Sequence, residues 1–568
     1  MDNNSSEIKN VVLAIVLSMV VIFGWSAYFA PEPVVIQDNV EATKNSSNLV
    51  DGDINILDES VNVKKASETL QELDNEFGSI KINTRKLSGS ISLKGGRIND
   101  LVLNTYKQEN TQDSEKVRLL SPRDTEKPYF VDTGWVGKKE LVPTSKTLWN
   151  TTNSVLSVDN PVTLVWTNPQ GVEFRKIYTI DEDYMISVKQ EVVNKSETGI
   201  EFADYGLVAR SSSDEGKKNM FILHDGPIGV LDGTLEEVDY SDVKDDKKIS
   251  YETTGGWIGF TDQFWLVTLI PQQQSSIKAN FRYLNNGLYQ SDFKNKGVYL
   301  KSGEKNSYEM RVFAGAKEIN VLDKYEAQYN IPMFDRAVDF GWFYFLTKPF
   351  FHFLHYLSGL TGNVGFAILL ITLIVKAFLF PLANKSYSSM AKMKVLAPRM
   401  EELKKQYGND RQGLSQAMMK LYRDEKVNPM AGCLPMLIQI PIFFSLYKVL
   451  FVTLETRHAP FIGWVTDLSA PDSLGVLTGF GFIDWQVPAY LSIINIGVWP
   501  ILMGISMWLQ FKFNPKPTDP IQAKIFGWMP IVFTFMLATF PVGLVIYWTW
   551  NNTLSIAQQY TIQKRTTG

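Results

Sequence analysis

The hydrophobic positions divide the chain into three zones: an apolar stretch near the N-terminus, a long zone of alternating polarity, and a C-terminal zone of long apolar runs. Residues 11–30 form a nearly unbroken apolar run, long enough to cross a bilayer as a helix. Trp25 and Tyr28 stand where a signal-peptidase site requires small side chains, which argues against cleavage. We therefore expect residues 1–30 to be an uncleaved transmembrane anchor.

The middle zone predicts a soluble, strand-rich domain. Residues 31–75 are polar and have the composition of a linker. In residues 76–325, short segments alternate between polar and apolar positions, and Asn168-Pro169-Gln170-Gly171 is a hairpin turn between two of them. Many short strands at this spacing are typical of an antiparallel sandwich, so we expect residues 76–325 to form one all-β domain.

The C-terminal zone, residues 357–568, predicts a helical membrane core. Its apolar runs give five candidate transmembrane helices, at residues 357–382, 434–454, 487–513, 525–540 and 542–562. Residues 326–356 carry charges followed by dense aromatic side chains. That pattern predicts an amphipathic helix lying in the membrane interface.

The loop at residues 383–428 has a periodicity of its own. Methionine and leucine recur every three or four positions on both sides of Gly408-Asn409-Asp410, which predicts a helical hairpin with a methionine-rich seam. The seam is either the core of a structural coiled coil or an adaptable surface for a partner. The sequence leaves both interpretations open.

Loop charges predict the orientation of these helices. Residues 383–428 hold ten lysines and arginines against five acidic residues, whereas residues 455–486 hold one arginine against four acidic residues. Because basic loops stay in the cytoplasm, we predict that the hairpin and both termini are cytoplasmic and that the β domain is exported.

The composition of the chain argues against several classes of function. The formal net charge of −4 gives no indication of direct nucleic-acid sequence recognition. The single cysteine, Cys433, excludes an intrachain disulfide. His352 and His355 share a helix face but have no third ligand nearby in the sequence, and no nucleotide-binding loop occurs. We therefore expect no metal site and no cofactor.

Three segments resemble the YidC family of membrane protein insertases: VDFGWFYFLTKPFF, the stretch from YSSMAKMKVLAPRM to NPMAGCLPMLIQIPIFFSLYKVL, and NPKPTDPIQAKIFGWMPIVFTFMLATFPVGLVIYW. The resemblance implies the Gram-negative type, with an anchor, a periplasmic β-supersandwich and a five-helix core in the bacterial inner membrane. It further implies a hydrated, positively charged groove in this core. Such proteins insert and help fold nascent membrane proteins, alone or with the Sec translocon, in the lipid bilayer and in transient contact with the ribosome. They are not enzymes, so no catalytic residues are expected.

Lys376 interrupts the first apolar run of the core. Gly365, Leu369, Thr372 and Lys376 are spaced to lie on one helix face, and a small or polar stripe faces protein more readily than lipid. The resemblance places the positive charge of the groove at Lys376, where the family usually has arginine. The alternative is that Lys376 extends its stem to a nearby helix end and only anchors it, as we expect for Lys448.

The resemblance also implies that Thr372, Gln439, Tyr547 and Trp548 contact the substrate. Each has a simpler interpretation. Thr372 can bond its own i−4 carbonyl, and Gln439 can link two helices. Tyr547 and Trp548 can belong to an aromatic belt at the membrane surface.

Two other functions fit the sequence less well. A sugar mutarotase needs a histidine acid–base pair with a carboxylate, and the exported domain offers only His224, although a two-carboxylate glycosidase stays open. A solute transporter is disfavoured because the five candidate spans show no inverted repeat.

Overall fold

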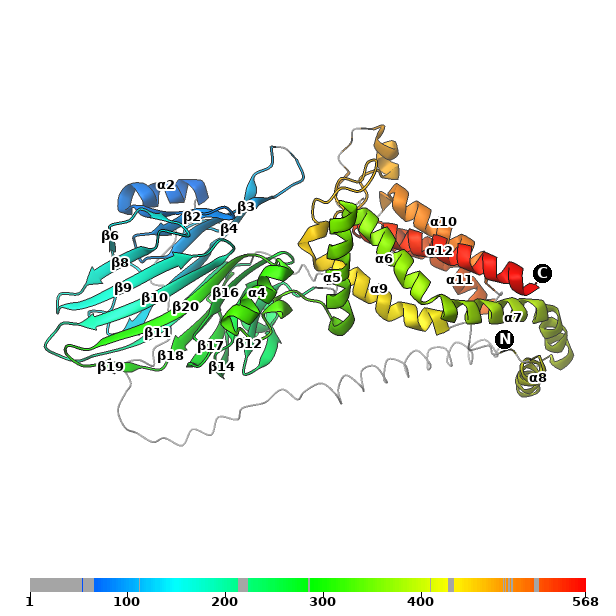
Figure 1. The fold of residues 1–568 in the computed structure, drawn as a ribbon, viewed down its shortest axis with the longest axis horizontal. Helices are drawn as coiled ribbons and strands as arrows, with labels where there is room; N and C mark the ends of the chain where they lie inside the picture. The colour runs from blue at the N-terminus through cyan, green and yellow to red at the C-terminus, as the bar shows by residue number, and fades with distance from the viewer. Residues whose placement is uncertain are drawn as a thin grey trace. The chain divides into compact units, whose positions relative to one another are not determined.

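A computed structural model describes residue 54 and residues 66–111, 113–212, 223–284, 287–408, 410–425, 427, 434–483, 485, 487–488, 491, 494–514 and 520–567. The predicted anchor at residues 1–30 and most of the predicted linker lie outside the described residues. The described chain consists of a β-rich part followed by a helical part (Figure 1).

The β-rich part contains two large sheets. The first has 11 strands, in the order β14 (Lys248–Thr254), β17 (Ser276–Tyr283), β18 (Leu288–Asn295), β11 (Ile200–Ser211), β5 (Tyr129–Gly137), β3 (Ile98–Lys107), β2 (Leu87–Ser92), β1 (Ser79–Asn83) and β7 (Val155–Leu156), with β19 (Val298–Leu300) beside β11 and β4 (Lys116–Leu120) beside β3. The second has nine, in the order β13 (Thr234–Glu237), β12 (Gly226–Leu231), β15 (Trp257–Thr261), β16 (Trp265–Ile270), β20 (Lys305–Ala316), β10 (Met185–Asn194), β9 (Val172–Ile180), β8 (Val162–Thr167) and β6 (Asn150–Thr151). Helices α2 (Ala66–Phe77) and α3 (Tyr240–Asp246) accompany the sheets.

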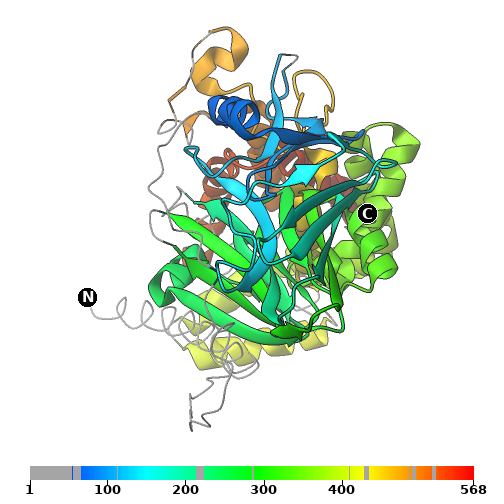
Figure 2. The ribbon, with the colours of Figure 1, turned by 90° about the vertical axis from the view of Figure 1, so that its left-hand side faces the viewer.

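The two sheets pack face to face around one apolar core, as the layers in Figure 2 show. Strand β9 illustrates how the sequence builds it: every second side chain from Val172 to Ile180 is buried. The predicted Asn168–Gly171 turn joins β8 to β9, with the Gly171 amide donating to the Asn168 carbonyl. The prediction of a large antiparallel sandwich therefore agrees with the observed strands.

One core position of β9 is a lysine. The Lys176 side chain is 1% exposed and donates hydrogen bonds to the carbonyls of Gly95 and Thr133. Its ammonium also lies 5.2 Å from the centre of the Trp149 ring. Burial lowers the pKa of the Lys176 ammonium to about 8.

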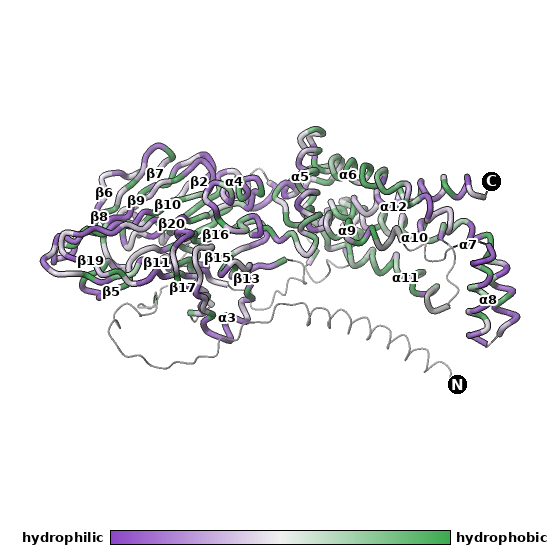
Figure 3. The backbone as a smooth tube through the Cα atoms, turned by 60° about the horizontal axis from the view of Figure 1, so that its bottom comes forward, coloured by the Kyte–Doolittle hydropathy of each residue, from purple (hydrophilic) through white to green (hydrophobic). Residues whose placement is uncertain are grey.

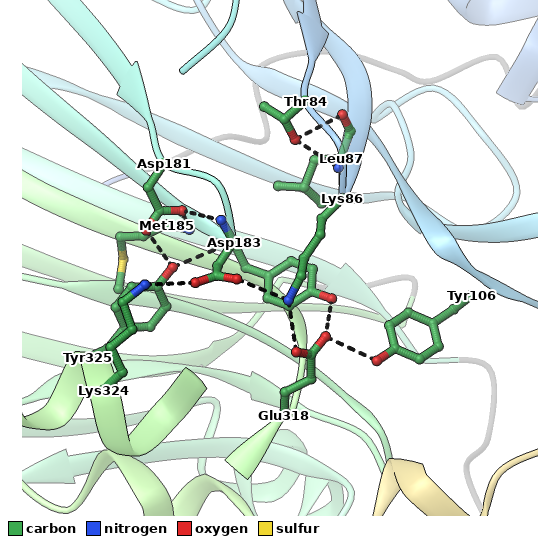
Figure 4. Close-up of polar contacts among 11 residues, drawn as sticks. Thr84, Lys86, Leu87, Tyr106, Asp181, Asp183, Met185, Glu318, Lys324 and Tyr325 are labelled. Atoms are coloured by element: carbon green, nitrogen blue, oxygen red, sulfur yellow. Dashed lines mark hydrogen bonds and ion pairs between the residues drawn. The ribbon is translucent and has the colours of Figure 1, made fainter. Parts of the chain in front are cut away.

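A polar cluster ties the start of α4 (Ile319–Tyr329) to the sandwich (Figure 4). The Glu318 carboxylate accepts hydrogen bonds from Lys86 Nζ at 2.8 Å, from the Tyr106 hydroxyl at 3.0 Å and from the Tyr184 hydroxyl at 2.5 Å. Lys86 also pairs with Asp183 at 3.0 Å. Lys86, directly before β2, and Glu318, directly before α4, are thus joined by an ion pair in which the lysine is buried and the carboxylate is partly buried.

The helical part contains α5 (Tyr344–Thr361), α6 (Val364–Phe378), α7 (Phe380–Tyr407), α8 (Arg411–Asp424), α9 (Leu434–Val452), α10 (Val498–Phe513), α11 (Pro520–Leu537) and α12 (Val542–Thr567), with short 3-10 helices η1 (Phe334–Ala337), η3 (Leu454–Thr456) and η4 (Val476–Gly481). The predicted break of the hairpin at Gly408–Asp410 separates α7 from α8. Figure 3 shows hydrophobic residues concentrated along α6, α9 and α11, and hydrophilic residues along α8.

Several predicted boundaries differ from the observed ones. The boundary at residue 325 falls inside α4, and the one at residue 356 falls inside α5. Helix α5 continues to Thr361 and ends because Gly362 adopts a left-handed conformation (φ 67°). Asn363 then caps α6, its side chain accepting a hydrogen bond from the Phe366 amide. The predicted span at 357–382 therefore contains the end of one helix, all of a second and the beginning of a third.

Within the described part of the chain, only one candidate for a complete membrane span meets the criteria of length and hydropathy. It is the pair formed by α6 and α7, which are bent by 68° at Leu379. The apolar stretches Ile438–Val452 and Ala523–Leu537 are shorter.

Candidate functional site

Lys376 lies in the last turn of α6, directly before the bend into α7. Pro381 stands at the start of α7, where a proline fits because its missing N–H has no helical partner. The opposite, N-terminal end of α6 packs against protein: a Cβ added to Gly365 would meet the Phe461 ring at 2.1 Å. The stripe that contains Gly365 and Thr372 is thus buried in the bundle, as expected for a small or polar helix face.

The partly buried Lys376 ammonium is directed at α12. Its Nζ donates a hydrogen bond of 2.8 Å to Ser555 Oγ. The described residues place no carboxylate within ion-pair distance of Lys376. Trp550 Nε1 donates to the Leu369 carbonyl at 3.2 Å, which holds α12 against α6 about two turns before Lys376. The site therefore presents a lysine whose described side-chain partner is a neutral hydroxyl.

Thr372, one turn before Lys376, is 2% exposed and donates a hydrogen bond of 2.6 Å to the carbonyl of Ile368. This is the local bond that a threonine in an apolar helix commonly makes. In this conformation its hydroxyl hydrogen is committed to the backbone of α6.

Gln439 and Tyr547 are brought together. Gln439 Nε2 on α9 donates a hydrogen bond of 3.2 Å to the Tyr547 hydroxyl on α12. Tyr547 is 2% exposed and stacks on Phe443, with ring centres 6.2 Å apart. The pair links two helices, which is the simpler of the two interpretations of Gln439.

Trp548 lies between α9 and α11. Its ring centre is 4.6 Å from that of Phe443 and 5.4 Å from that of Phe533. Trp548 and Ser555 are seven residues apart, or about 10 Å along α12. The predicted residues therefore form two groups along the bundle: Gln439, Tyr547 and Trp548 in one, and Thr372 and Lys376 in the other.

Sequence reasoning missed the polar face of α12. Asn552, Ser555 and Gln559 are buried at 3%, 2% and 0% exposure, and Asn551 and Gln558 flank them. Recurring amides and a serine at three- and four-residue spacing in a candidate membrane helix were the available signal, because buried polar side chains need partners.

Two further predictions concern the hairpin and Lys448 of α9. In the hairpin, the Tyr422 hydroxyl lies 3.7 Å from Met400 Sδ and Arg399 pairs with Glu425 at 2.6 Å, so α7 and α8 contact each other across the predicted seam. Lys448 forms an ion pair of 2.7 Å with Asp339, whereas we expected it to extend to the membrane surface.

No group of three or more His, Cys, Asp or Glu side chains among the described residues is placed to hold a metal ion. His355 instead lies against Glu455, and His352 lies 3.7 Å from Asp323.

Comparisons with known proteins cover nearly the whole chain. The family model described as the YidC periplasmic domain matches residues 79–353, and the model described as 60Kd inner membrane protein matches residues 356–568. The proteins named membrane protein insertase YidC from Rickettsia canadensis (strain McKiel) and Rickettsia prowazekii (strain Madrid E) are 46% and 45% identical to this chain over 570 residues, covering 99% of it and 100% of each relative.

Solved structures are similar at lower levels. The crystal structure of an active YidC insertase with its first transmembrane domain resolved is 18% identical, with a TM-score of 0.35, covering 85% of this chain and 92% of the other. A galactose mutarotase related enzyme from Lactobacillus acidophilus is 12% identical, with a TM-score of 0.29, covering 42% of this chain and 97% of the other. At these TM-scores neither likeness bears on activity.

The resemblance predicted from sequence is thus confirmed over the full length of the chain. So is the order of its parts, a β-rich periplasmic domain followed by a C-terminal helical region. The identity to the relatives over nearly all of both sequences shows that this chain belongs to the YidC family of membrane protein insertases.

Proposed function

We propose that this protein inserts nascent membrane proteins into the bacterial inner membrane through a hydrated groove in which Lys376 supplies positive charge. The observation that carries the proposal is the state of Lys376: its ammonium points into the helical bundle, bonds a hydroxyl, and has no carboxylate partner among the described residues. A charge inside a membrane protein that is not neutralised by a resident counter-ion is suited to attracting the opposite charge of a ligand.

Acidic segments of a substrate are that ligand. The groove charge attracts an acidic exported segment, while the partitioning of the substrate's apolar segment into lipid drives the insertion. A lysine suits this role because its point charge is mobile and binds a passing carboxylate without the two-pronged geometry that arginine provides. Basic segments are repelled, so they stay in the cytoplasm.

All five predicted residues belong to the proposed groove wall. Lys376, Gln439 and Trp548 are partly exposed and contact a passing chain directly. Thr372 and Tyr547 are each 2% exposed, so they reach the substrate only when their helices separate.

Short helices suit the protein to assist insertion in a second way, by thinning the bilayer around it. Helix α10 has 16 residues and α11 has 18, lengths of about 24 and 27 Å. The hydrocarbon core of a bilayer is about 30 Å thick. Spans this short thin the bilayer locally and shorten the path of a polar segment through hydrocarbon.

The topology that accompanies this function has both termini and the α7–α8 hairpin in the cytoplasm and six spans in total, including the anchor at residues 1–30. The Sec translocon and the ribosome are the proposed partners, and the basic hairpin is the surface for the ribosome or the nascent chain.

Reconstitution tests the proposal. Purified protein in liposomes should protect the exported segment of a ribosome-made, single-span substrate from added protease, whereas empty liposomes should not. Equal protection in both would contradict the insertase function of this chain.

A further inference from the structure

Helix α12 carries two polar faces with different neighbours. One face bonds α10: Asn552 Nδ2 donates to Ser506 Oγ at 3.0 Å, and Gln559 Nε2 donates to Asn514 Oδ1 at 3.0 Å. The other face bonds α6, through Ser555 and Gln558. The first face joins two helices by bonds between neutral groups, whereas the second one meets the charged lysine.

The Ser555 hydroxyl is oriented by its own helix. Ser555 Oγ donates a hydrogen bond of 2.8 Å to the carbonyl of Asn551, so its lone pairs are directed away from that carbonyl and accept the Lys376 ammonium. Gln558 Nε2 lies 3.5 Å from the main-chain carbonyl of Lys376. Helix α12 thus contacts this lysine at both its backbone and the tip of its side chain.

The Ser555 hydrogen bond matters because Lys376 lies at a helix end, where its ammonium could also reach the membrane surface. Lys376 lies in the last turn of α6, and the next helix leaves at 68°. A lysine in such a place can extend its stem toward the membrane surface, because its four carbons are flexible and its ammonium is strongly hydrated. Two positions are therefore available to the ammonium, inside the bundle or at the surface, and a hydrogen bond inside favours the first.

We propose that Ser555 is a positioning residue that keeps the Lys376 ammonium inside the bundle. It touches no substrate itself; it selects the inward position of the charge. This proposal deepens the proposed function and rests on it only for the consequence for insertion, since the position of the ammonium can be measured separately.

Two amide oxygens beside Ser555 show how few hydrogen bonds hold this part of the α6–α12 contact. Asn551 Oδ1 and Gln558 Oε1 are buried and have no hydrogen-bond partner among the described residues. A buried carbonyl without a donor is unfavourable. The α6–α12 contact is therefore poorly satisfied around Ser555, and the serine–lysine bond is its shortest side-chain bond.

The test measures where the ammonium is. Full-length protein in liposomes is treated with a membrane-impermeant amine-reactive ester, and the labelling rate of Lys376 is determined by mass spectrometry. Ser555→Ala should raise this rate about tenfold, the factor that corresponds to a charge-assisted hydrogen bond at the weak end of its usual range. Ser555→Thr keeps the hydroxyl and should label as slowly as the wild type.

Asn552→Ala is the matched control, because it removes a buried polar side chain of α12 that faces α10. It should leave the labelling of Lys376 unchanged. Equal labelling of Lys376 in wild type, Ser555→Ala and Ser555→Thr would overturn the positioning role, as would the same increase in Asn552→Ala and Ser555→Ala.

Insertion assays separate this proposal from the function it deepens. Ser555→Ala should reduce insertion of substrates with acidic exported segments and spare strongly hydrophobic ones. If labelling rises in Ser555→Ala but Lys376→Ala inserts every substrate normally, the positioning role holds and the groove function of Lys376 fails.

Discussion

Gln439 on α9 and Tyr547 on α12 share a hydrogen bond of 3.2 Å, and the adjacent Trp548 packs between α9 and α11. These two neighbouring aromatic residues of α12 thus have different surroundings. Tyr547 is buried and hydrogen-bonded, whereas Trp548 is partly exposed.

Because their surroundings differ, substitutions of Tyr547 and Trp548 should have different effects on stability and on insertion. Tyr547→Phe removes the acceptor of Gln439 and should lower stability by about 1 kcal/mol, with insertion reduced less than about twofold. Trp548→Ala should reduce insertion more strongly at equal protein abundance. Thermal unfolding in detergent and protease protection in liposomes measure the two effects. A larger insertion defect in Tyr547→Phe than in Trp548→Ala would reverse the assignment.

The polar cluster around Glu318 should stabilise the β domain. Glu318→Ala leaves the buried Lys86 with Asp183 alone and removes the acceptor of two tyrosines, so we expect a loss of about 1–3 kcal/mol in the free energy of unfolding. The exposed Glu252 on β14 is the control, and Glu252→Ala should change stability by less than about 0.5 kcal/mol. Similar effects of the two variants would show that the cluster adds nothing.

The buried Lys176 predicts a pH dependence. Its pKa is about 8 in the folded domain and near 10.5 when unfolded, so between these values the unfolded chain binds more protons. Stability contributed by this group therefore rises with pH, by at most about 1.4 kcal/mol per pH unit. Relative to Lys176→Met, the wild type should gain up to about 3 kcal/mol between pH 8 and pH 10.5. Denaturant unfolding followed by tryptophan fluorescence measures this difference, and a constant difference would contradict the prediction.

The hairpin prediction can be sharpened by the structure. Ala383 and Tyr387 pack against Ile562 of α12, so the base of α7 belongs to the bundle. Replacing only residues 399–423 with a short Gly-Ser linker should leave the bundle folded and impair insertion. Full insertion activity without these residues would reduce the hairpin to a connector.

Topology has a direct test. In a Cys433→Ser background, the substituted residue of Lys404→Cys should be labelled by a membrane-impermeant thiol reagent only from the cytoplasmic side of the membrane. Labelling from the periplasmic side would overturn the whole proposed arrangement.

Much of the fold was predictable because it follows from local patterns. Alternation predicted strands such as β9, and the Gly408–Asp410 break predicted the end of α7. Contacts between distant segments were not predictable. The Lys448–Asp339 pair joins residues 109 apart, and the Lys376–Ser555 bond joins residues 179 apart. The end of a helix inside an apolar run was also not predictable, because it depends on a single glycine, Gly362.

The central claim is that Lys376 is the charge of the groove. Its most direct test is the insertion of substrates that differ only in the number of acidic residues in their exported tail, by wild type, Lys376→Arg, Lys376→Ala and Lys376→Glu. Wild type and Lys376→Arg should insert acidic tails well, Lys376→Ala should lose them progressively as acidic residues are added, and Lys376→Glu should lose them most, because it repels them in a medium that screens charge poorly. The same response to tail charge in all four proteins would contradict the account and make Lys376 an anchor at a helix end.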